Sequence, residues 1–447
     1  MLQHQEANDK AENDFAVPEV YGSEGEYFAS NINPGVRFLG RSQEKRMVLT
    51  QEKLDVTVKK RSNLFSWRGQ FTPEFVEYVL QSFSKTGDYI LDPFSGSGTV
   101  LLESAKLNLQ AIGFEINPAA YAMSKFFTFC NLSITDRIEF ANKFELKLNP
   151  YLTHLNGQRV YTENPDYRAA YSNLLRFAET VDNQFTEKSE RVFFLNILFQ
   201  SEKDKSLTLR ESILKSFHYT KSIFLELPFS DKPISALLND ARHTGDALTN
   251  KIDLILTSPP YINVFNYHQN YRAIIETFNF NILKVAHSEF GSNRKNRGNR
   301  FKTVIQYCID MEQSIRAFWN ALRPNGRIVL IVGRESNVRG NPFYNGQMVV
   351  EILERSDAFI DIKILERKFT NKFGDNIKED IIIATKAGVL AKTLSGRSIA
   401  LKHLENCLHA STNGVVADIT DAINNIDAVT ASPIFDPKSI ISNEGHK

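Results

Sequence analysis

The stretch of sequence that decides the fold is YILDPFSGSGT, Tyr89–Thr99. The pattern predicts a short apolar strand, an acidic residue and a glycine-rich turn, and Val100–Ala105 continues it as a helix. Glycines at such a turn let the backbone approach a ligand closely, and the start of a helix offers unpaired N–H groups. Because the turn lacks the Gly-Lys-Ser/Thr ending of a phosphate loop, the sequence argues against binding of a nucleoside triphosphate.

Two further acids are placed at strand ends. Glu115 ends the next apolar stretch, Ala111–Glu115, and Asp240 comes shortly before the apolar stretch Ile252–Leu256. An acidic side chain at the tip of the second strand of a doubly wound sheet commonly binds two ribose hydroxyls. Each carboxylate alone is an ordinary turn former or a solvated charge. Their order along the chain, after a glycine turn, favours binding roles for both.

The strand Ile252–Leu256 runs directly into the pentapeptide Thr257–Tyr261, TSPPY. Two consecutive prolines have a fixed φ and no N–H, so the chain is stiff there and its carbonyls are left free. A serine hydroxyl precedes the prolines and an aromatic ring follows them. This arrangement suits an exocyclic amino group on a flat ring, such as a nucleobase, although the pentapeptide alone is equally consistent with a proline turn.

Taken together, these segments resemble those of a known family, the S-adenosylmethionine-dependent amino methyltransferases of DNA, which modify cytosine N4 or adenine N6. The matching segments are Trp67–Glu74 (WRGQFTPE), Asp92–Thr99 (DPFSGSGT), Gly113–Pro118 (GFEINP), Asp240–Arg242 (DAR) and Thr257–Tyr261. The resemblance covers roughly residues 60–130 and 235–385. It implies an α/β fold with a doubly wound, mainly parallel seven-stranded sheet of the Rossmann-like class I methyltransferase type, which ends in two late strands close to a hairpin.

The resemblance also implies a cofactor, S-adenosylmethionine, and the residues that bind it. Glu115 would hold the ribose hydroxyls, Asp240 the adenine amino group, and Thr72 the methionine carboxylate. The complete set of expected cofactor-binding residues is Thr72, Asp92, Phe94, Gly96, Gly98, Glu115 and Asp240.

The catalytic tip implied by the resemblance is Ser258, Pro259, Pro260 and Tyr261. The Ser258 hydroxyl and the Pro259 carbonyl would accept the hydrogens of the target amino group, and Tyr261 would stack on a base that has left the duplex. Methylation of a cytosine ring carbon is excluded, because that reaction needs a nucleophilic cysteine in a Pro-Cys pair. The three cysteines here follow Phe129, Tyr307 and Asn406.

Aromatic and cationic side chains gather after the catalytic tip. The formal net charge of the chain is only +1, so contact with nucleic acid must come from local patches. The segment Gly291–Lys302 carries five cations and no acid, and contacts of these side chains with phosphates would make binding strongly salt-dependent. Such a charge run is usually a solvated loop, and His268 is expected to be structural. The expected nucleic-acid contacts are Asn263, Tyr267, Arg294, Lys295, Arg297 and Arg300.

The α/β pattern is interrupted once, and this divides the chain. We expect a flexible arm at 1–30, the cofactor-binding half at 31–130, a mostly helical insertion at 131–230, the catalytic half at 231–386 and a tail at 387–447. The insertion falls between the second and third strands, where it could serve target recognition, act as a lid or form an oligomer contact. No run of about 18 apolar residues is present, and the three cysteines are widely spaced. A cytoplasmic protein without metal is therefore expected.

Several functions stay open at this point. The leading interpretation is a site-specific DNA methyltransferase, with cytosine N4 ahead of adenine N6 because Ser258 rather than Asp or Asn precedes the two prolines. Restriction–modification, with a cognate endonuclease encoded nearby, or genome marking would be its setting. The alternatives are an RNA amino methyltransferase and a non-catalytic nucleic-acid-binding or regulatory protein on the same fold.

Overall fold

The computed structural model describes residues 49–56, 59–155, 157–161, 166–204, 208–262, 266–291, 296–370, 374–411 and 414–439. All of these residues belong to one compact unit that begins at Leu49. The predicted arm at 1–30 lies outside the described residues, and so do the predicted nucleic-acid contacts Asn263, Arg294 and Lys295.

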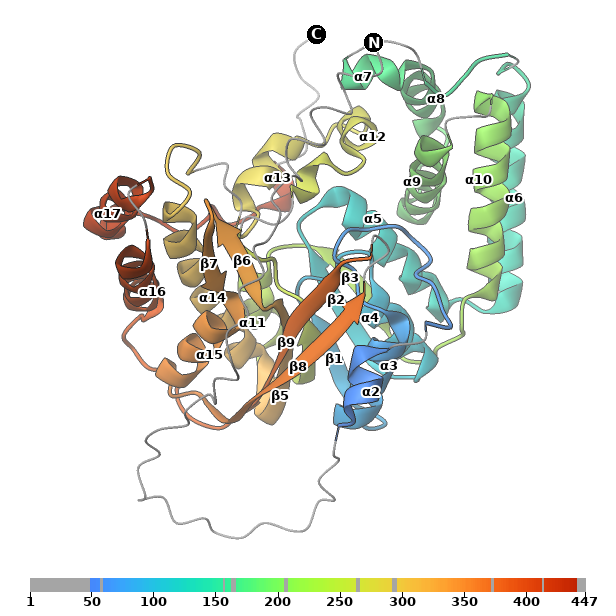
Figure 1. The fold of residues 1–447 in the computed structure, drawn as a ribbon. Helices are drawn as coiled ribbons and strands as arrows, with labels where there is room; N and C mark the ends of the chain where they lie inside the picture. Colours follow the sequence, from blue (N-terminus) through green and yellow to red (C-terminus); the bar gives the residue numbers. More distant parts are fainter. Residues whose placement is uncertain are drawn as a thin grey trace. The chain divides into compact units, whose positions relative to one another are not determined.

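A seven-stranded sheet in the order β3-β2-β1-β4-β5-β9-β8 forms the centre of this unit (Figure 1). Its strands are β1 (Tyr89–Asp92), β2 (Gln110–Glu115), β3 (Ile234–Leu238), β4 (Ile252–Thr257), β5 (Leu322–Gly333), β8 (Phe359–Thr370) and β9 (Asn376–Lys386). The first five are parallel to one another, whereas β9 is antiparallel to both β5 and β8. The predicted doubly wound, mainly parallel sheet with a late hairpin is therefore confirmed.

Both faces of the sheet are buried, as expected for parallel strands connected by helices. Successive residues of β4 point to opposite sides, so Leu254 and Leu256 belong to one apolar core and Ile255 to the other. Figure 1 shows α3 and α4 on one side and α14 and α15 on the other. The bounds of the helices around the sheet are α2 (Gln51–Asp55), α3 (Pro73–Phe83), α4 (Thr99–Lys106), α5 (Pro118–Phe126), η2 (Ala241–His243), α11 (Thr244–Leu248), α14 (Lys302–Ala321) and α15 (Asn345–Arg355).

The chain order of the strands turns back between β1 and β4. From β1 the chain proceeds outward to β2 and β3, and then returns to the other side of β1 as β4. Doubly wound sheets bind their ligands at the carboxyl ends of the strands beside such a switch point. The glycine turn after β1 and the TSPPY segment after β4 both lie at this edge.

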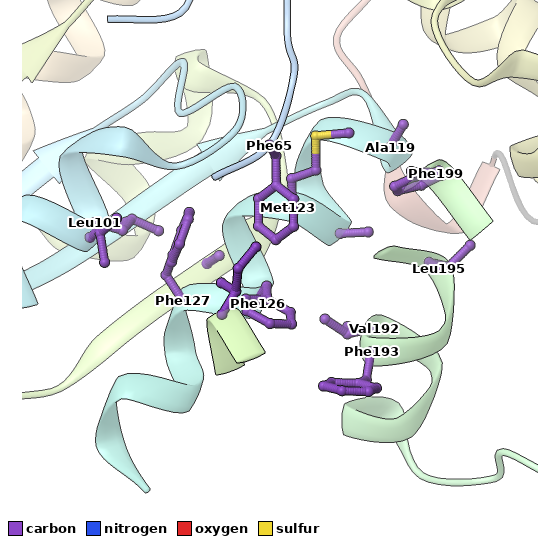
Figure 2. Packing of buried hydrophobic residues seen from close by; sticks show 14 of the residues in the cluster. Phe65, Leu101, Ala119, Met123, Phe126, Phe127, Val192, Phe193, Leu195 and Phe199 are labelled. Atoms are coloured by element: carbon purple, nitrogen blue, oxygen red, sulfur yellow. The ribbon is translucent and has the colours of Figure 1, made fainter. Parts of the chain in front are cut away.

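A helical insertion separates β2 from β3 in the chain, as the sequence predicts. It consists of η1 (Phe127–Asn131), α6 (Ile134–Leu152), α7 (Tyr167–Ala170), α8 (Ser172–Asp182), α9 (Lys188–Lys203) and α10 (Leu209–Glu226). Phenylalanine rings connect it to the rest of the unit, and Phe126 of α5 stacks on Phe193 of α9 with their centroids 6.0 Å apart (Figure 2). The insertion therefore extends the core of the cofactor-binding half.

Two predicted boundaries differ from the structure. The helix expected from about Met311 begins at Lys302, because residues 303–309 are all buried and show no amphipathic pattern. The expected turn at Arg323–Gly326 lies inside β5 as a register irregularity, with Asn325 at φ +63°. The connections that the sequence left irregular contain η3 (Tyr267–Gln269), α12 (Arg272–Thr277), α13 (Ile282–Ser288) and the hairpin β6 (Glu335–Val338) and β7 (Asn341–Tyr344).

The chain after β9 packs onto α14. It forms α16 (Gly396–Ala410), α17 (Val416–Asn424), η4 (Ile426–Ala428) and η5 (Pro437–Ser439). The carboxylate of Glu312 on α14 accepts hydrogen bonds from Ser395 N at 2.7 Å and Gly396 N at 2.9 Å, which satisfies two N–H groups at the start of α16.

All three cysteines are buried and free. No cluster of potential metal ligands occurs among the described residues. In the same part of the chain, no helix combines the length and apolar character needed to cross a membrane.

Candidate functional site

One pocket at the carboxyl ends of β1, β2 and β4 gathers most of the predicted site residues. Those that line it are Asp92, Phe94, Gly96, Glu115, Asp240, Ser258, Pro260, Tyr261 and Tyr267. The remaining wall comes from Trp67–Phe71, the rest of the glycine turn, Ile116–Asn117, Ala241 and Glu289–Phe290. Residues from both halves of the chain thus share one cavity.

Three predicted residues lie behind the pocket wall. Thr72 precedes α3, and its hydroxyl accepts a hydrogen bond from Arg367 Nη2 at 3.2 Å. Pro259 is buried. Gly98 has φ +86°, and a Cβ there would lie 2.7 Å from Ser124 Cα. Gly98 therefore allows α4 to pack closely on α5 rather than forming the pocket surface.

Glu115 holds the glycine turn in place. Its Oε2 accepts a hydrogen bond from Gly96 N at 2.9 Å, and its Oε1 accepts one from Asn117 N at 2.8 Å. Each oxygen keeps a further lone pair, which suits the two hydroxyls of a ribose. Burial raises the pKa of Glu115 to about 7, and these backbone hydrogen bonds oppose the shift.

Asp92 joins the two strands that meet at the switch point. Its Oδ1 accepts hydrogen bonds from Thr257 Oγ1 at 2.6 Å and from Phe94 N at 3.2 Å. Burial raises the pKa of Asp92 to about 7. A cation placed in the pocket would favour the ionised form of this carboxyl and of Glu115.

Aromatic side chains close the pocket on the side of the glycine turn. Trp67 and Tyr267 stack with their centroids 6.0 Å apart and their planes at 15°. Gln70 Oε1 accepts a hydrogen bond from Ser97 Oγ at 2.8 Å, and Asn117 Nδ2 donates to the Tyr267 carbonyl at 3.3 Å. Tyr267, predicted as a nucleic-acid contact, is thereby placed beside the predicted cofactor-binding residues.

Asp240 accepts four hydrogen bonds. Arg242 N and Nε both donate to Oδ1 at 2.9 Å, while Arg242 Nη2 at 2.7 Å and Phe435 N at 3.0 Å donate to Oδ2. A carboxylate has about four lone-pair positions, so this acid is saturated. Its predicted contact with an adenine amino group stays a prediction, and it requires one of these hydrogen bonds to lengthen.

The C-terminal segment supplies partners to the same cluster. Asp310 on α14 accepts from Ser432 N at 2.8 Å and from Ser432 Oγ at 2.6 Å. Arg242 donates to the carbonyl oxygens of Ser432 at 2.7 Å and Pro433 at 3.0 Å. The guanidinium of Arg242 also lies 4.9 Å from the ring centroid of Phe290, which lines the pocket.

The catalytic tip is in contact with the late hairpin. Ser258 Oγ lies 3.2 Å from Tyr261 Oη, and Tyr261 Oη donates to Glu379 Oε1 of β9 at 3.4 Å. A Cβ at Gly333 would lie 2.9 Å from the Tyr261 ring, so this glycine leaves room for the tyrosine. Burial, and next the charge of Glu379, raise the pKa of Tyr261 well above 10.

The two predicted basic contacts that the structure describes are outside the pocket. Arg297 and Arg300 are exposed, and neither has an ion pair with another described residue. Between them, Asn299 is buried and donates to Asp418 O at 2.7 Å and Asp421 Oδ2 at 2.8 Å. This segment is therefore anchored on α17 while its two arginines face solvent.

The sequence did not reveal several pocket residues. Glu289 and Phe290 follow α13 without a recognisable motif, and Glu289 Oε2 lies 2.8 Å from the Nδ1 of the buried His268. A structural role for His268 fits this contact. For Arg242, the sequence offers only its position two residues after Asp240, from which its side chain can bind the Asp240 carboxylate.

The wall fits an adenosyl cofactor that carries positive charge. Asp92 and Glu115 offer carboxylates at the glycine turn, and Ile116 and Phe290 offer apolar surfaces suited to a flat ring. Ser95 Oγ is buried in this turn and has no hydrogen-bond partner among the described residues. A Cβ at Gly96 would lie 3.3 Å from the Trp67 ring, so only glycine keeps this close approach open.

Comparisons with known proteins find similarity to DNA methyltransferases over parts of the chain. An N6/N4 methyltransferase family model, described as a DNA methylase, matches residues 13–126. The type II methyltransferase M.MjaII of Methanocaldococcus jannaschii is 24% identical over 208 residues, 43% of this chain and 38% of that protein. The type II methyltransferase M.BsoBI of Geobacillus stearothermophilus is 26% identical over 258 residues, 47% of this chain and 51% of that protein. The matches thus span about half or less of these relatives' lengths.

A solved SAM-dependent methyltransferase from Methanosarcina mazei aligns over 69% of this chain and 97% of its own, with 11% identity and a TM-score of 0.30. A similarity this low adds nothing to the strand order, which by itself defines the fold. The family model covers the Trp67–Glu74 segment, the glycine turn and Glu115. The family model and the two relatives thus make parts of this chain similar to N6/N4 DNA methylases.

Proposed function

We propose that the protein transfers a methyl group from S-adenosylmethionine to an exocyclic amino nitrogen of a DNA base. The observation that carries the proposal is the shared pocket, in which the acids of the glycine turn and the Ser258–Tyr261 tip line one cavity. When bound, the cofactor supplies an electrophilic methyl group on a positively charged sulfur. Asp92 and Glu115 lie where they can bind its charged and ribose parts.

The Ser258–Tyr261 segment can activate the target nitrogen, which is the difficult part of this reaction. The lone pair of an exocyclic amino nitrogen is delocalised into the ring, so the nitrogen is a poor nucleophile. The Ser258 hydroxyl and the Pro259 carbonyl would accept its N–H hydrogens and orient the lone pair toward the methyl group. Much of the rate would come from this alignment in a preorganised polar site.

The target base and the wider setting are part of the proposal. We favour cytosine N4 over adenine N6, because Ser258 stands before the prolines. The stacked pair of Trp67 and Tyr267 supports a role for Tyr267 at the cofactor, while the exposed Arg297 and Arg300 are suited to phosphate contacts. Asn263, Arg294 and Lys295 complete the proposed DNA contacts, and the helical insertion is the proposed recognition region.

The relatives' names include type II methyltransferases, which supports a role in restriction–modification. We further propose that the protein acts in the cytoplasm beside a cognate endonuclease. A genomic neighbour that encodes such a nuclease would fit this setting.

One assay tests the proposal. Purified protein is incubated with methyl-labelled S-adenosylmethionine and either unmethylated DNA or total RNA, and the nucleic acid is digested to nucleosides. We expect label in N4-methyldeoxycytidine. Label in N6-methyldeoxyadenosine would show that the target base is adenine instead of cytosine. Label in RNA alone would contradict the proposal, and cofactor binding without any transfer would indicate a regulatory protein.

A further inference from the structure

A chain of polar groups extends from the catalytic tip into the late hairpin. Ser258 Oγ lies 3.2 Å from Tyr261 Oη, which lies 3.4 Å from Glu379 Oε1. The other oxygen of Glu379 accepts a hydrogen bond from Arg367 Nη1 at 2.8 Å. Arg367 and Glu379 are direct partners in the β8–β9 pairing, so the sheet register itself brings them together.

Arg367, the last member of this row of hydrogen-bonded side chains, is held in place on several sides. Its guanidinium lies between the rings of Phe75 and Phe369, 4.2 and 4.4 Å from their centroids, and its side chain is 2% exposed. Its Nε donates to the Leu54 carbonyl at 2.9 Å and its Nη2 to Thr72 Oγ1 at 3.2 Å. Because arginine keeps its charge in proteins, this buried cation requires an ionised carboxylate beside it.

The charges of Arg367 and Glu379 determine which group donates in each hydrogen bond between Glu379 and Ser258. An ionised carboxylate only accepts, so Tyr261 must donate its single hydrogen to Glu379. The Tyr261 oxygen is then left to accept, and Ser258 supplies the hydrogen. With its hydrogen directed at Tyr261, Ser258 presents only lone pairs to the pocket.

We propose that Glu379, fixed by Arg367, is a positioning residue that makes Ser258 a hydrogen-bond acceptor toward the substrate. The inference rests on the proposed function and narrows its substrate class. An acceptor at Ser258 favours a ring that presents an amino group, as cytosine and adenine do, and disfavours one that presents a carbonyl oxygen at the same place. A Ser258 that donated instead would compete for the nitrogen lone pair that must attack the methyl group.

The substitution Glu379→Gln tests this arrangement, because glutamine has nearly the same shape but carries an NH₂ group that can donate to Tyr261. We expect kcat for methyl transfer to fall at least about tenfold while KM for S-adenosylmethionine stays unchanged. The matched control is Glu366→Gln on the neighbouring strand. Glu366 pairs with Arg334 and has no contact with the Ser258 chain, so its variant should keep the wild-type kcat.

A double-variant comparison separates positioning from simple loss of structure. In a Tyr261→Phe variant, Glu379 is no longer connected to Ser258 by hydrogen bonds, so adding Glu379→Gln should lower kcat no further. A full additional loss in this background would show that Glu379 acts only through stability. Thermal melting of each variant identifies any that fail to fold.

A second readout needs neither DNA nor cofactor, and so remains available if Glu379→Gln is unstable in the assay. Ultraviolet titration of the tyrosines, with the Tyr261→Phe spectrum subtracted, reports the pKa of Tyr261. Removing the charge of Glu379 should lower this pKa, because a nearby negative charge opposes ionisation of the phenol. An unchanged pKa, or an unchanged kcat in a folded variant, would overturn the positioning role alone. A wild-type protein that methylates no nucleic acid would overturn the proposed function and the acceptor role with it.

Discussion

Two carboxyl groups at the glycine turn, the buried Asp92 and the half-buried Glu115, have no ion-pair partner among the described residues. Asp92 and Glu115 both have a pKa raised to about 7, and burial is the largest cause for each. The folded protein therefore binds these two protons more tightly than the unfolded chain does between about pH 4 and pH 7. With that sign, the two groups lower the free energy of unfolding as the pH rises through this window. Such an unfavourable arrangement is typical of a binding site that lacks its ligand.

The first prediction concerns the pH dependence of cofactor binding. A bound cation favours the ionised carboxylates, so binding should release protons near pH 7, and the affinity for S-adenosylmethionine should rise from pH 6 to pH 8 by about tenfold. Isothermal titration calorimetry in two buffers with different ionisation enthalpies measures the released protons. The amine of the cofactor also releases protons, but equally with every variant. The difference in proton release between the wild type and Asp92→Asn therefore reports the contribution of Asp92. Equal proton release by the wild type and Asp92→Asn would contradict the assignment of Asp92.

At the scale of elements, the C-terminal segment binds charged residues of the catalytic half that lie beside the pocket, from a great distance along the chain. Ser432 and Phe435 are 2% exposed, and they donate to Asp310 and Asp240, respectively. Without this segment, Arg242 and Asp310 would lose partners while remaining largely buried, which is costly for charged groups. Residues after α17 therefore stabilise the part of the pocket wall that Phe290 forms.

The second prediction is that removal of residues 429–447 lowers the affinity for S-adenosylmethionine by at least about tenfold and lowers the melting temperature, because a buried charge cluster loses its partners. Removal of residues 440–447 alone is the matched control, since it retains every contact described above. Calorimetry and thermal melting measure both truncations. If the longer truncation bound the cofactor as the wild type does, the segment would have no part in the site.

At the scale of the whole molecule, the parts that the sequence predicted are those with a local signature. The glycine turn, Glu115 and the TSPPY segment each carry a recognisable pattern of strand, turn and side chain, and their order determines the sheet. The pairing of Arg367 with Glu379 has no such signature, since it depends on strand register, and neither has the docking of Ser432. The stacking of Tyr267 on Trp67 is likewise a result of packing that the sequence does not show, and the predicted base contact of Tyr267 stays a prediction.

We propose that the glycine turn binds the methyl donor and that the Ser258–Tyr261 segment positions the base for transfer. The most direct measurement compares the wild type with Ser258→Ala in two assays, transfer of labelled methyl to DNA and equilibrium binding of S-adenosylmethionine. We expect the variant to lose about a hundredfold or more of its transfer rate, since a preorganised polar contact is removed, while its Kd for the cofactor stays within about twofold of the wild type. Transfer at the wild-type rate, or loss of cofactor binding together with transfer, would contradict this proposal.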